Sequence, residues 1–375
     1  GRSRSMAPAS RIAARLADLS HAQLVEIAAA GCEASTEVKN RADAILAAHK
    51  PLAQWAVEGV LLSSDLVPHL LAPLQLEDGA AAAVCSRWAE GWKATSEGRR
   101  RLRKVAFDFP QGLLGKTSLD MAVVPGGDEL VVRSDNWVHI LARDMSVVSS
   151  FEIPGSFGCI AASKEFIYAT EVDCDIRCFT HDGTEVAKYE DPDKRIAFPV
   201  LGPGGLLFCN LFNDGDGTQD EIVALDAQTM QPRHRFGQSL LKSACGMAVV
   251  GEELFVCDTG NDRLQVFSLA GEHRRSITGE WKRPIALCFV KDRLYLVEQG
   301  DHDEDEEGEL INPLQGRRIF VLSLQGETLQ VYTHAEDQFF GNLCCFDGKL
   351  LASAQERQGS DEGSDSVAVV ALLGM

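Results

Sequence analysis

The residue types that most often carry chemistry gather in a few short segments of this 375-residue sequence. The first is Gly115-Lys116-Thr117, which is typical of the end of a phosphate-binding loop, G-x-x-x-x-G-K-S/T. In that pattern the first glycine would fall at Pro110, which has no backbone N–H to offer a phosphate. The residues from Ser118 onward also alternate as a strand does, where the loop requires a helix. We therefore do not expect nucleotide binding here.

Two acidic segments are the next candidates, this time for cation binding. Residues 213–221 read NDGDGTQDE, a composition typical of calcium loops, but the ligand spacing that ends in a bidentate glutamate is absent. Residues 301–307 read DHDEDEE and have the charge density of a solvated, disordered insertion. We interpret the first segment as a polar turn and the second as such an insertion. No metal site is predicted.

Cysteines are the remaining reactive residues. The 11 cysteines are scattered through segments with strand alternation, for example Cys209, Cys257 and Cys288. No C-x-x-C pair occurs, so the pattern supports neither a zinc site nor a disulfide framework. We interpret the cysteines as buried free thiols of a soluble protein in a reducing compartment, cytoplasmic or nuclear, and we predict no cofactor.

Strands must position these residues. Residues 245–279 show most clearly the alternation of residues that is typical of strands. Short apolar runs alternate there with turn residues at Gly251, at 259–261 and at 270–271. This is the pattern of a four-stranded antiparallel meander, and about 35 residues are too few to bury both of its faces. The segment is therefore one unit of a repeating array.

The same order recurs along the chain. Candidate first strands return at intervals of 39 to 56 residues, centred on Met121, Ile160, Val200, Met247, Leu287 and Leu343. Each is followed by a second apolar strand, such as ELFVCD at 253–258, and by a third, such as WVHILA at 137–142. Intervals of about 40 residues are typical of propeller blades. The chain is therefore predicted to be mainly β, with a six-bladed β-propeller over residues 104–375.

The end of the array supports a closed ring. The last unit ends at Met375 after its third strand, so its outer strand must come from elsewhere. Residues 104–109, KVAFDF, precede the first unit and alternate as a strand does. We predict that they complete the last blade as a velcro closure, which removes exposed sheet edges.

The segment DTGNDRLQVF and the strands around it closely resemble an NHL repeat. The resemblance implies an NHL-type propeller in which three residues hold a tight turn and pair across blades: Asp258, Asn261 and Arg263. The turn chemistry of Asp, Asn and Gly is sufficient to explain them, so their expected role is structural.

Residues 8–103 are different, because they are rich in Ala and Leu at helical spacing. We predict a disordered leader at 1–7, an α-helical region at 8–54 and a second helical segment at 55–103. The leader is rich in Arg and Ser but continues into a regular amphipathic helix, so organellar targeting is not expected. No apolar run approaches the roughly 18 residues of a membrane helix.

The segment at 55–103 contains a leucine helix, an L-x-x-x-D turn and a helix with V-C-x-x-W, an order that resembles an F-box. The match covers about 25 residues, and Val67-Pro68 stands where Leu-Pro is usual. The resemblance implies a surface for the adaptor of cullin-based ubiquitin ligases, formed or supported by Leu66, Pro68, Leu70, Leu74, Val84, Cys85 and Trp88. The alternative is a purely structural helical cap. Exposure of the face that carries Leu70 and Trp88 distinguishes the two.

Charge divides the chain in two. Residues 1–104 carry a balance of +3, which leaves −22 for residues 105–375 out of a total of −19. Some NHL propellers bind RNA through a basic face, and phosphate binding needs clustered Lys and Arg. The acidic propeller therefore argues against RNA and favours a protein partner on a propeller face.

Six-bladed propellers also include metal-dependent hydrolases, whose metal lies in the central channel. Such a site needs several carboxylate, amide or imidazole ligands from different inner strands. The predicted inner strands offer only Asp120 and Asn342. We therefore predict an interaction protein that links a bound protein to a ubiquitin-ligase adaptor, and not an enzyme. The alternatives are a propeller scaffold without a ubiquitin link and a metal-dependent hydrolase.

Overall fold

The computed structural model describes residues 63, 66–72, 82–95, 100–114, 119–153, 158–171, 175–212, 220–301, 312, 314–336, 338–356 and 367–373. The chain divides into two compact units, residues 1–101 with Gly374 and residues 102–373 with Met375. The predicted leader at 1–7 and the helical region at 8–54 lie outside the described residues.

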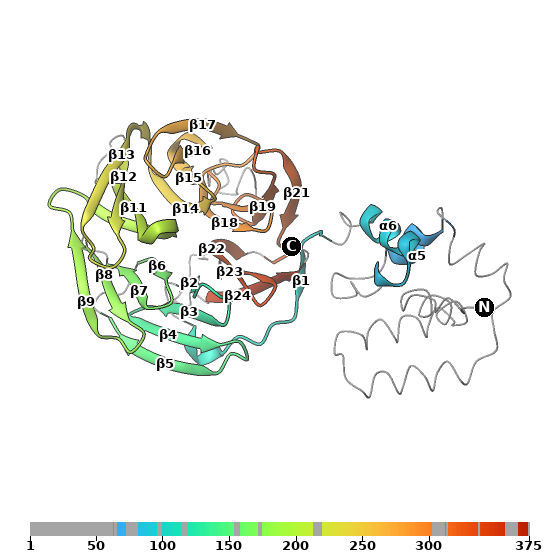
Figure 1. Ribbon diagram of the computed structural model, residues 1–375, viewed down its shortest axis with the longest axis horizontal. Helices are drawn as coiled ribbons and strands as arrows, with labels where there is room; N and C mark the ends of the chain where they lie inside the picture. Colours follow the sequence, from blue (N-terminus) through green and yellow to red (C-terminus); the bar gives the residue numbers. More distant parts are fainter. Residues whose placement is uncertain are drawn as a thin grey trace, which may run out of the picture. The chain divides into compact units, whose positions relative to one another are not determined.

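The second unit is a ring of six four-stranded antiparallel sheets (Figure 1). From the innermost strand outward, the first two blades are β2 (Leu119–Val123), β3 (Glu129–Ser134), β4 (Trp137–Ala142) and β5 (Val147–Glu152), then β6 (Ile160–Ala162), β7 (Phe166–Thr170), β8 (Asp175–Thr180) and β9 (Glu185–Glu190). The next two are β10 (Arg195–Gly202), β11 (Leu206–Phe212), β12 (Asp220–Asp226) and β13 (Pro232–Leu241), then β14 (Ala244–Val250), β15 (Glu253–Asp258), β16 (Arg263–Ser268) and β17 (His273–Thr278). The last two are β18 (Pro284–Val290), β19 (Arg293–Glu298), β20 (Arg318–Leu322) and β21 (Thr328–Thr333), then β22 (Gln338–Phe346), β23 (Lys349–Glu356), β24 (Val367–Leu373) and β1 (Arg103–Val105).

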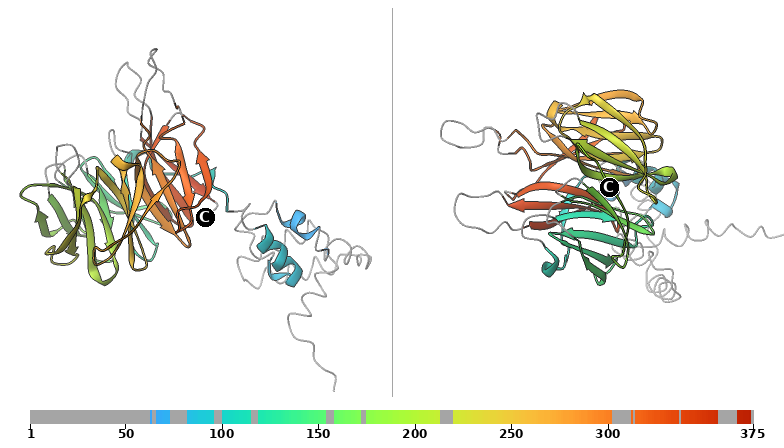
Figure 2. Two further views of the ribbon diagram at one scale, coloured as in Figure 1. Left: turned by 90° about the horizontal axis from the view of Figure 1, so that it is seen from above. Right: turned by 90° about the vertical axis from the view of Figure 1, so that its left-hand side faces the viewer.

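The six-bladed propeller predicted from the repeats is therefore confirmed, with the first, second and third strands of each blade where their apolar runs lie. Seen from the side, the strands cross the thickness of the ring (Figure 2). Within the described part of the propeller, three short 3-10 helices accompany them: η3 (Gln111–Leu113), η4 (Pro203–Gly205) and η5 (Thr259–Asn261).

The strands of a blade form because each of their faces is covered by a neighbouring blade. In β15, Leu254 and Val256 pack into a core shared with the preceding blade, whereas Phe255 and Cys257 pack into a core shared with the following one. All four side chains are fully buried. Successive side chains of a strand point to opposite faces, so burial on both sides needs a continuous apolar run. The outermost strands have only partly covered faces and carry mostly polar side chains, as in β17.

The ring closes where β1 pairs with β24, with Arg103 opposite Leu373 and Val105 opposite Ala371. This strand begins one residue before the predicted closure at 104–109 and ends at Val105, so the prediction was too long at its end. The reason is packing: Phe109 is buried and Phe107 half-buried in the core between the last blade and the first. That core draws the chain away from the edge of the sheet.

In the first unit, two helices are described, α5 (Val67–Leu71) and α6 (Ser86–Ala94). They pack closely at Gly91, where an added Cβ would lie 2.6 Å from Cγ1 of Val67. Leu71 and Trp88 are buried in the same unit. Among the described residues, no helix has the length and apolar character needed to span a membrane.

Ring closure is open to test at Leu102, which directly precedes β1. Leu102 is 5% exposed and packs in the core between the fifth and sixth blades. We expect Leu102→Asp to lower the free energy of unfolding by about 3 kcal/mol, because it removes apolar burial and encloses a charge. The measurement is denaturant unfolding of the full chain followed by circular dichroism. Val148, 56% exposed on β5, provides the control, and Val148→Asp is expected to stay within about 0.5 kcal/mol of the parent. Equal midpoints for the two variants would contradict this account of closure.

Candidate functional site

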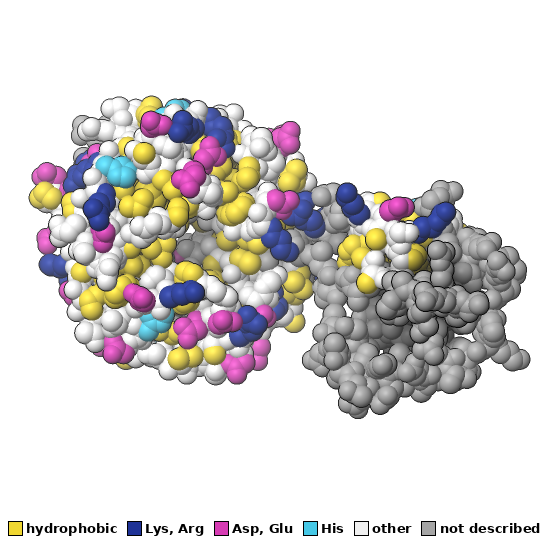
Figure 3. Space-filling model, viewed as in Figure 1, with side chains coloured by type: hydrophobic (Ala, Val, Ile, Leu, Met, Phe, Trp, Pro, Cys, Tyr) yellow, Lys and Arg dark blue, Asp and Glu magenta, His cyan; other side chains and the backbone are white. Residues whose placement is uncertain are grey.

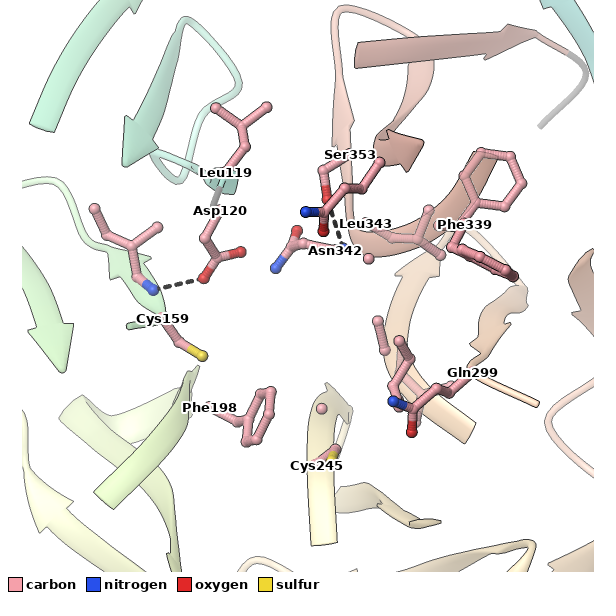
Figure 4. A pocket seen from close by; sticks show the side chains of 18 of the residues that line it. Leu119, Asp120, Cys159, Phe198, Cys245, Gln299, Phe339, Asn342, Leu343 and Ser353 are labelled. Carbon is pink, nitrogen blue, oxygen red and sulfur yellow. Dashed lines mark hydrogen bonds between the residues drawn. The ribbon is translucent and has the colours of Figure 1, made fainter. Parts of the chain in front are cut away.

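A cavity of about 620 Å³ lies on the axis of the propeller, lined mainly by residues of all six innermost strands and the segments that lead into them, and by a few residues on or beside the second and third strands (Figure 4). Most of its wall is apolar, with aromatic rings from Phe198 and Phe339. Polar side chains line it at a few points: Asp120, Gln299, Asn342, Ser353 and Gln355. An apolar pocket with a small number of polar groups is the usual form of a binding site. We call this cavity the channel pocket.

Four β-bulges shape the channel pocket. The register of the innermost strand breaks between Ala197 and Val200 in β10, and at corresponding places in β14, β18 and β22. The bulged residues face the cavity, among them Phe198, Cys245 and Asn342. A bulge inserts an extra residue into a ladder and redirects its side chain. The pocket is therefore formed where the innermost strands depart from regular pairing.

Phe198, at the bulge in β10, has a strained backbone conformation. Its φ of 52° lies in the left-handed region, which is uncommon for a bulky side chain. Such strain persists only where the surrounding structure imposes it, and it is concentrated at functional sites. Here the strained residue is followed by Pro199, and both line the cavity.

The bulges leave some backbone groups without a hydrogen-bond partner on the neighbouring strand. Side chains of the second strands and of the turns after them form hydrogen bonds with these groups. Asn210 donates its side-chain N–H to the carbonyl of Cys245, and Thr259 donates its hydroxyl to the carbonyl of Pro284 at 2.6 Å. Ser353 Oγ accepts a hydrogen bond from the backbone N–H of Asn342 at 2.8 Å. Buried backbone groups require such partners, so these side chains hold the pocket wall in place.

Asp120 is the charged centre of the channel pocket. It is 8% exposed, and its two carboxylate oxygens accept hydrogen bonds from the backbone N–H groups of Met121 and Ile160, at 2.9 and 2.7 Å. Burial raises the pKa of Asp120 to about 6, against the opposing effects of these hydrogen bonds, the nearby Arg133 guanidinium and the side chain of Asn342. The carboxyl group therefore changes charge close to neutral pH.

The two cysteines of the pocket stay neutral. Burial is the main cause that raises the pKa of Cys159 and of Cys245 above the usual range of a thiol. A thiol needs a lowered pKa to act as a nucleophile at neutral pH. Together with Phe198, which lies near both in Figure 4, they form part of the wall.

Asp120 and Asn342, the two polar residues predicted for the channel, do lie together in the pocket. Sequence reasoning missed Phe198, Gln299 and Ser353. The signal for Phe198 was present, because Phe-Pro inside an inner strand removes a ladder N–H and marks a bulge. No pattern pointed to Gln299, which follows β19, or to Ser353, which lies on β23.

The residues expected to hold the NHL-like turn form one hydrogen-bonded cluster. Asp258 is fully buried and accepts hydrogen bonds from Asn261 Nδ2 at 2.9 Å, from Arg263 Nε at 2.7 Å and from the backbone N–H of Lys242 at 2.8 Å. Lys242 lies on the segment that leads from the third blade into the fourth. The cluster thus fastens a turn to a connection between blades.

The F-box-like residues divide between core and surface within their own unit. Leu66 is 42% exposed, while Trp88 is only 4% exposed. The others are half-buried, namely Pro68, Leu70, Val84 and Cys85. Leu74 lies outside the described residues. Trp88 therefore supports the unit from inside, and the accessible part of the predicted surface surrounds Leu66.

No group of three or more His, Cys, Asp or Glu side chains that could hold a metal ion is found in the described part of the chain. On the face of the propeller seen in Figure 3, hydrophobic side chains gather toward the centre, and charged side chains of both signs lie mainly farther out.

Comparisons with known proteins identify the fold. The chain matches no protein-family model and no curated protein by sequence. A solved luciferin-regenerating enzyme is similar over 73% of this chain and 95% of its own, with 14% identity and a TM-score of 0.52. BamB from Moraxella catarrhalis matches over 73% and 98%, with 14% identity and a TM-score of 0.46. A protein of unknown function from Bacteroides caccae matches over 64% and 89%, with 12% identity and a TM-score of 0.49. At 14% identity and a TM-score of 0.52, the likeness to the luciferin-regenerating enzyme shows the fold alone.

The raised pKa of Asp120 predicts a pH dependence of stability. A carboxyl whose folded pKa lies above its unfolded value stabilises the fold fully below the unfolded pKa, and this contribution is lost as pH rises through about 6. Asp120→Asn cannot ionise, so the stability of the parent relative to this variant should fall by about 1.5 kcal/mol between pH 5 and pH 7.5. Denaturant unfolding of both proteins at each pH measures it. A difference that does not change with pH would refute a raised pKa at this site.

The Asp258 cluster predicts a structural effect. We expect Asp258→Ala to cost about 3 kcal/mol of stability, because it leaves Arg263 and a buried N–H without their acceptor. Glu272→Ala is the control, since Glu272 pairs with Arg274 on the surface and is 67% exposed. Thermal unfolding of both variants makes the comparison. A loss of similar size in both would mean that the cluster has no special structural role.

Proposed function

We propose that this protein is an interaction module whose propeller binds part of a partner protein in the channel pocket. The observation that carries the proposal is the pocket itself: an open, largely apolar cavity with three aromatic side chains, Phe198, Phe339 and Phe340, and a few fixed polar groups. Pockets of this kind suit the recognition of a side chain or a short segment. The rigid ring around it provides the fixed geometry that recognition needs.

We further propose that the helical segment at 55–103 contacts an adaptor of cullin-based ubiquitin ligases. This rests on the resemblance to an F-box and on the exposure of Leu66, beside the half-buried Pro68 and Leu70. On this proposal the propeller selects a protein and the helices bring it to the ligase, in the cytoplasm or the nucleus. A scaffold with the same propeller and no ubiquitin link is the alternative.

An enzymatic role is the second candidate. One protein with the same fold is named a luciferin-regenerating enzyme, and Asp120 titrates near neutral pH. Among the described residues that line the pocket, however, Asp120 is the single carboxylate. A calcium cage would draw several oxygen ligands from the wall, so the geometry favours binding.

Adaptor binding is tested with the full chain and a purified cullin-adaptor subunit. We expect Leu66→Asp to abolish capture, because a charge replaces an exposed apolar contact, while the thermal melt stays unchanged. Val148→Asp, on an outer strand of the propeller, is the matched surface control and should capture normally. No capture by the folded parent chain would leave the scaffold alternative in its place.

Partner binding in the channel pocket is tested by site-specific cross-linking in cells. A photoreactive residue at position 299, in the pocket wall, is expected to cross-link to a partner protein, whereas the same residue at position 148 should not give that product. Products that are identical from both positions, or absent from position 299, would contradict a partner in the pocket.

A further inference from the structure

We propose that the channel pocket binds a primary ammonium group carried on an apolar stem, with the Asp120 carboxylate as its counter-ion and Asn342 Oδ1 as a second acceptor. The inference rests on the proposed function and gives the class of ligand that the pocket selects.

The first argument is a surplus of hydrogen-bond acceptors. Each oxygen of Asp120 accepts one backbone N–H, and the side chain of Asn342 also hydrogen-bonds to this carboxylate, whose two oxygens can together accept about four hydrogen bonds. Asn342 Oδ1 is buried and has no hydrogen-bond partner among the described residues. A buried polar atom in this state calls for a donor. An ammonium group has three N–H donors and no acceptor, so it suits a carboxylate beside an unsatisfied carbonyl oxygen.

The second argument is charge. No Lys or Arg is among the described residues that line the pocket. The cation that acts on Asp120 is Arg133, which is almost completely buried and donates a hydrogen bond to the carbonyl of Thr170 in the next blade. Arg133 favours the ionised form of Asp120 but is itself committed to the contact between blades. The balance of −22 for residues 105–375 adds a field that attracts cations.

The third argument is the apolar wall. Phe198 and Phe339 supply aromatic rings, and Leu119, Ile160 and Met247 supply aliphatic surface. A hydrocarbon chain gains free energy from burial against such a wall, and an aromatic face attracts a cation that comes to lie over it. The strained bulge at Phe198 places one of these rings in the cavity. The apolar wall of the pocket therefore suits the hydrocarbon stem of an alkylamine, and the acceptors of Asp120 and Asn342 suit its ammonium group.

Two sources share this chemistry, a lysine side chain of a partner protein and a free alkylamine. The direct test uses hexylamine, hexanol and hexanoate as probes of the full chain, with binding measured by ligand-observed NMR at pH 7.5. We expect hexylamine to bind at least about 10 times more tightly than hexanol, with no binding of hexanoate. Equal binding of hexylamine and hexanol would reduce the site to an apolar cavity and overturn the proposal.

Variants identify the counter-ion. Asp120→Asn should weaken hexylamine about 10-fold or more, and Asn342→Ala should weaken it severalfold with the carboxylate intact. Val148→Ser, on the outermost strand of the first blade and exposed, should bind as the parent does. Unchanged affinity in both pocket variants would refute the assignment. Displacement of hexylamine by calcium ions would instead assign these oxygens to a metal and also refute it.

A pH series on the parent chain also identifies the counter-ion, and it does not require that Asp120→Asn folds. Hexylamine should bind about 10 times more weakly at pH 5 than at pH 7.5, because the Asp120 carboxyl becomes protonated. The other titratable groups that act on Asp120 keep their charge in this range: Arg133 stays cationic, and burial keeps the thiols of Cys159 and Cys344 neutral. Hexanol provides the control, since its binding should not respond to pH. Affinity for hexylamine that is independent of pH would contradict a carboxylate counter-ion.

The source of the amine is tested with a lysine blocked at both ends of its backbone and the same compound acetylated on Nζ. Binding of the first at a strength similar to hexylamine, and loss on acetylation, would assign the pocket to a lysine of a partner. Binding of hexylamine alone would assign it to a free alkylamine. A cross-linked partner at position 299 without any amine binding would refute the ligand class and leave the proposed function intact. Amine binding without a cross-linked partner would support the ligand class and contradict the proposed binding of a partner protein.

Discussion

No blade of this propeller can cover its own two faces, and the rest of the structure depends on that constraint. A four-stranded sheet with continuous apolar strands exposes hydrophobic surface on both sides until a neighbour lies against each. Residues such as Phe255 and Leu254, adjacent on β15, are buried against different blades. Every blade therefore needs a neighbouring blade on each of its faces, and this is achieved only when the ring closes. The three residue pairs between β1 and β24 complete the last blade and so stabilise all six.

The same constraint explains where polar side chains are buried. Close packing of blades buries many backbone groups near the connections between them, and these groups take hydrogen-bond partners from a neighbouring blade. Asp120 accepts from Ile160, Asn210 donates to Cys245, and Asp258 accepts from Lys242. These contacts fasten successive blades near the axis. Asp120 combines this role with a place in the pocket, which is why its carboxyl group is both enclosed and accessible to a ligand.

The channel pocket follows from the geometry of the ring. Innermost strands converge on the axis, and bulges in four of them turn side chains and backbone toward the cavity. The pocket is thus held by the whole ring and has little freedom to collapse. Recognition of a charged head and an apolar stem needs such preorganisation, because a flexible site would lose affinity to ordering of its side chains. The helical unit has its own exposed apolar residue, Leu66, on which the proposed adaptor contact depends.

The sequence by itself determined the class of fold, the number of blades and the order of strands. Strand alternation and the spacing of repeats are local properties, and they predicted ELFVCD and WVHILA as strands with the bounds that β15 and β4 have. They also singled out Asp120 and Asn342, since a polar residue in an apolar inner strand is conspicuous. Tertiary structure alone decided that these two meet, that Phe198 faces the axis and that closure ends at Val105, because those outcomes depend on packing between segments far apart in the chain. The exposure of Leu66 and the burial of Trp88 were decided in the same way, since a helical pattern shows which residues share a face but not what covers it.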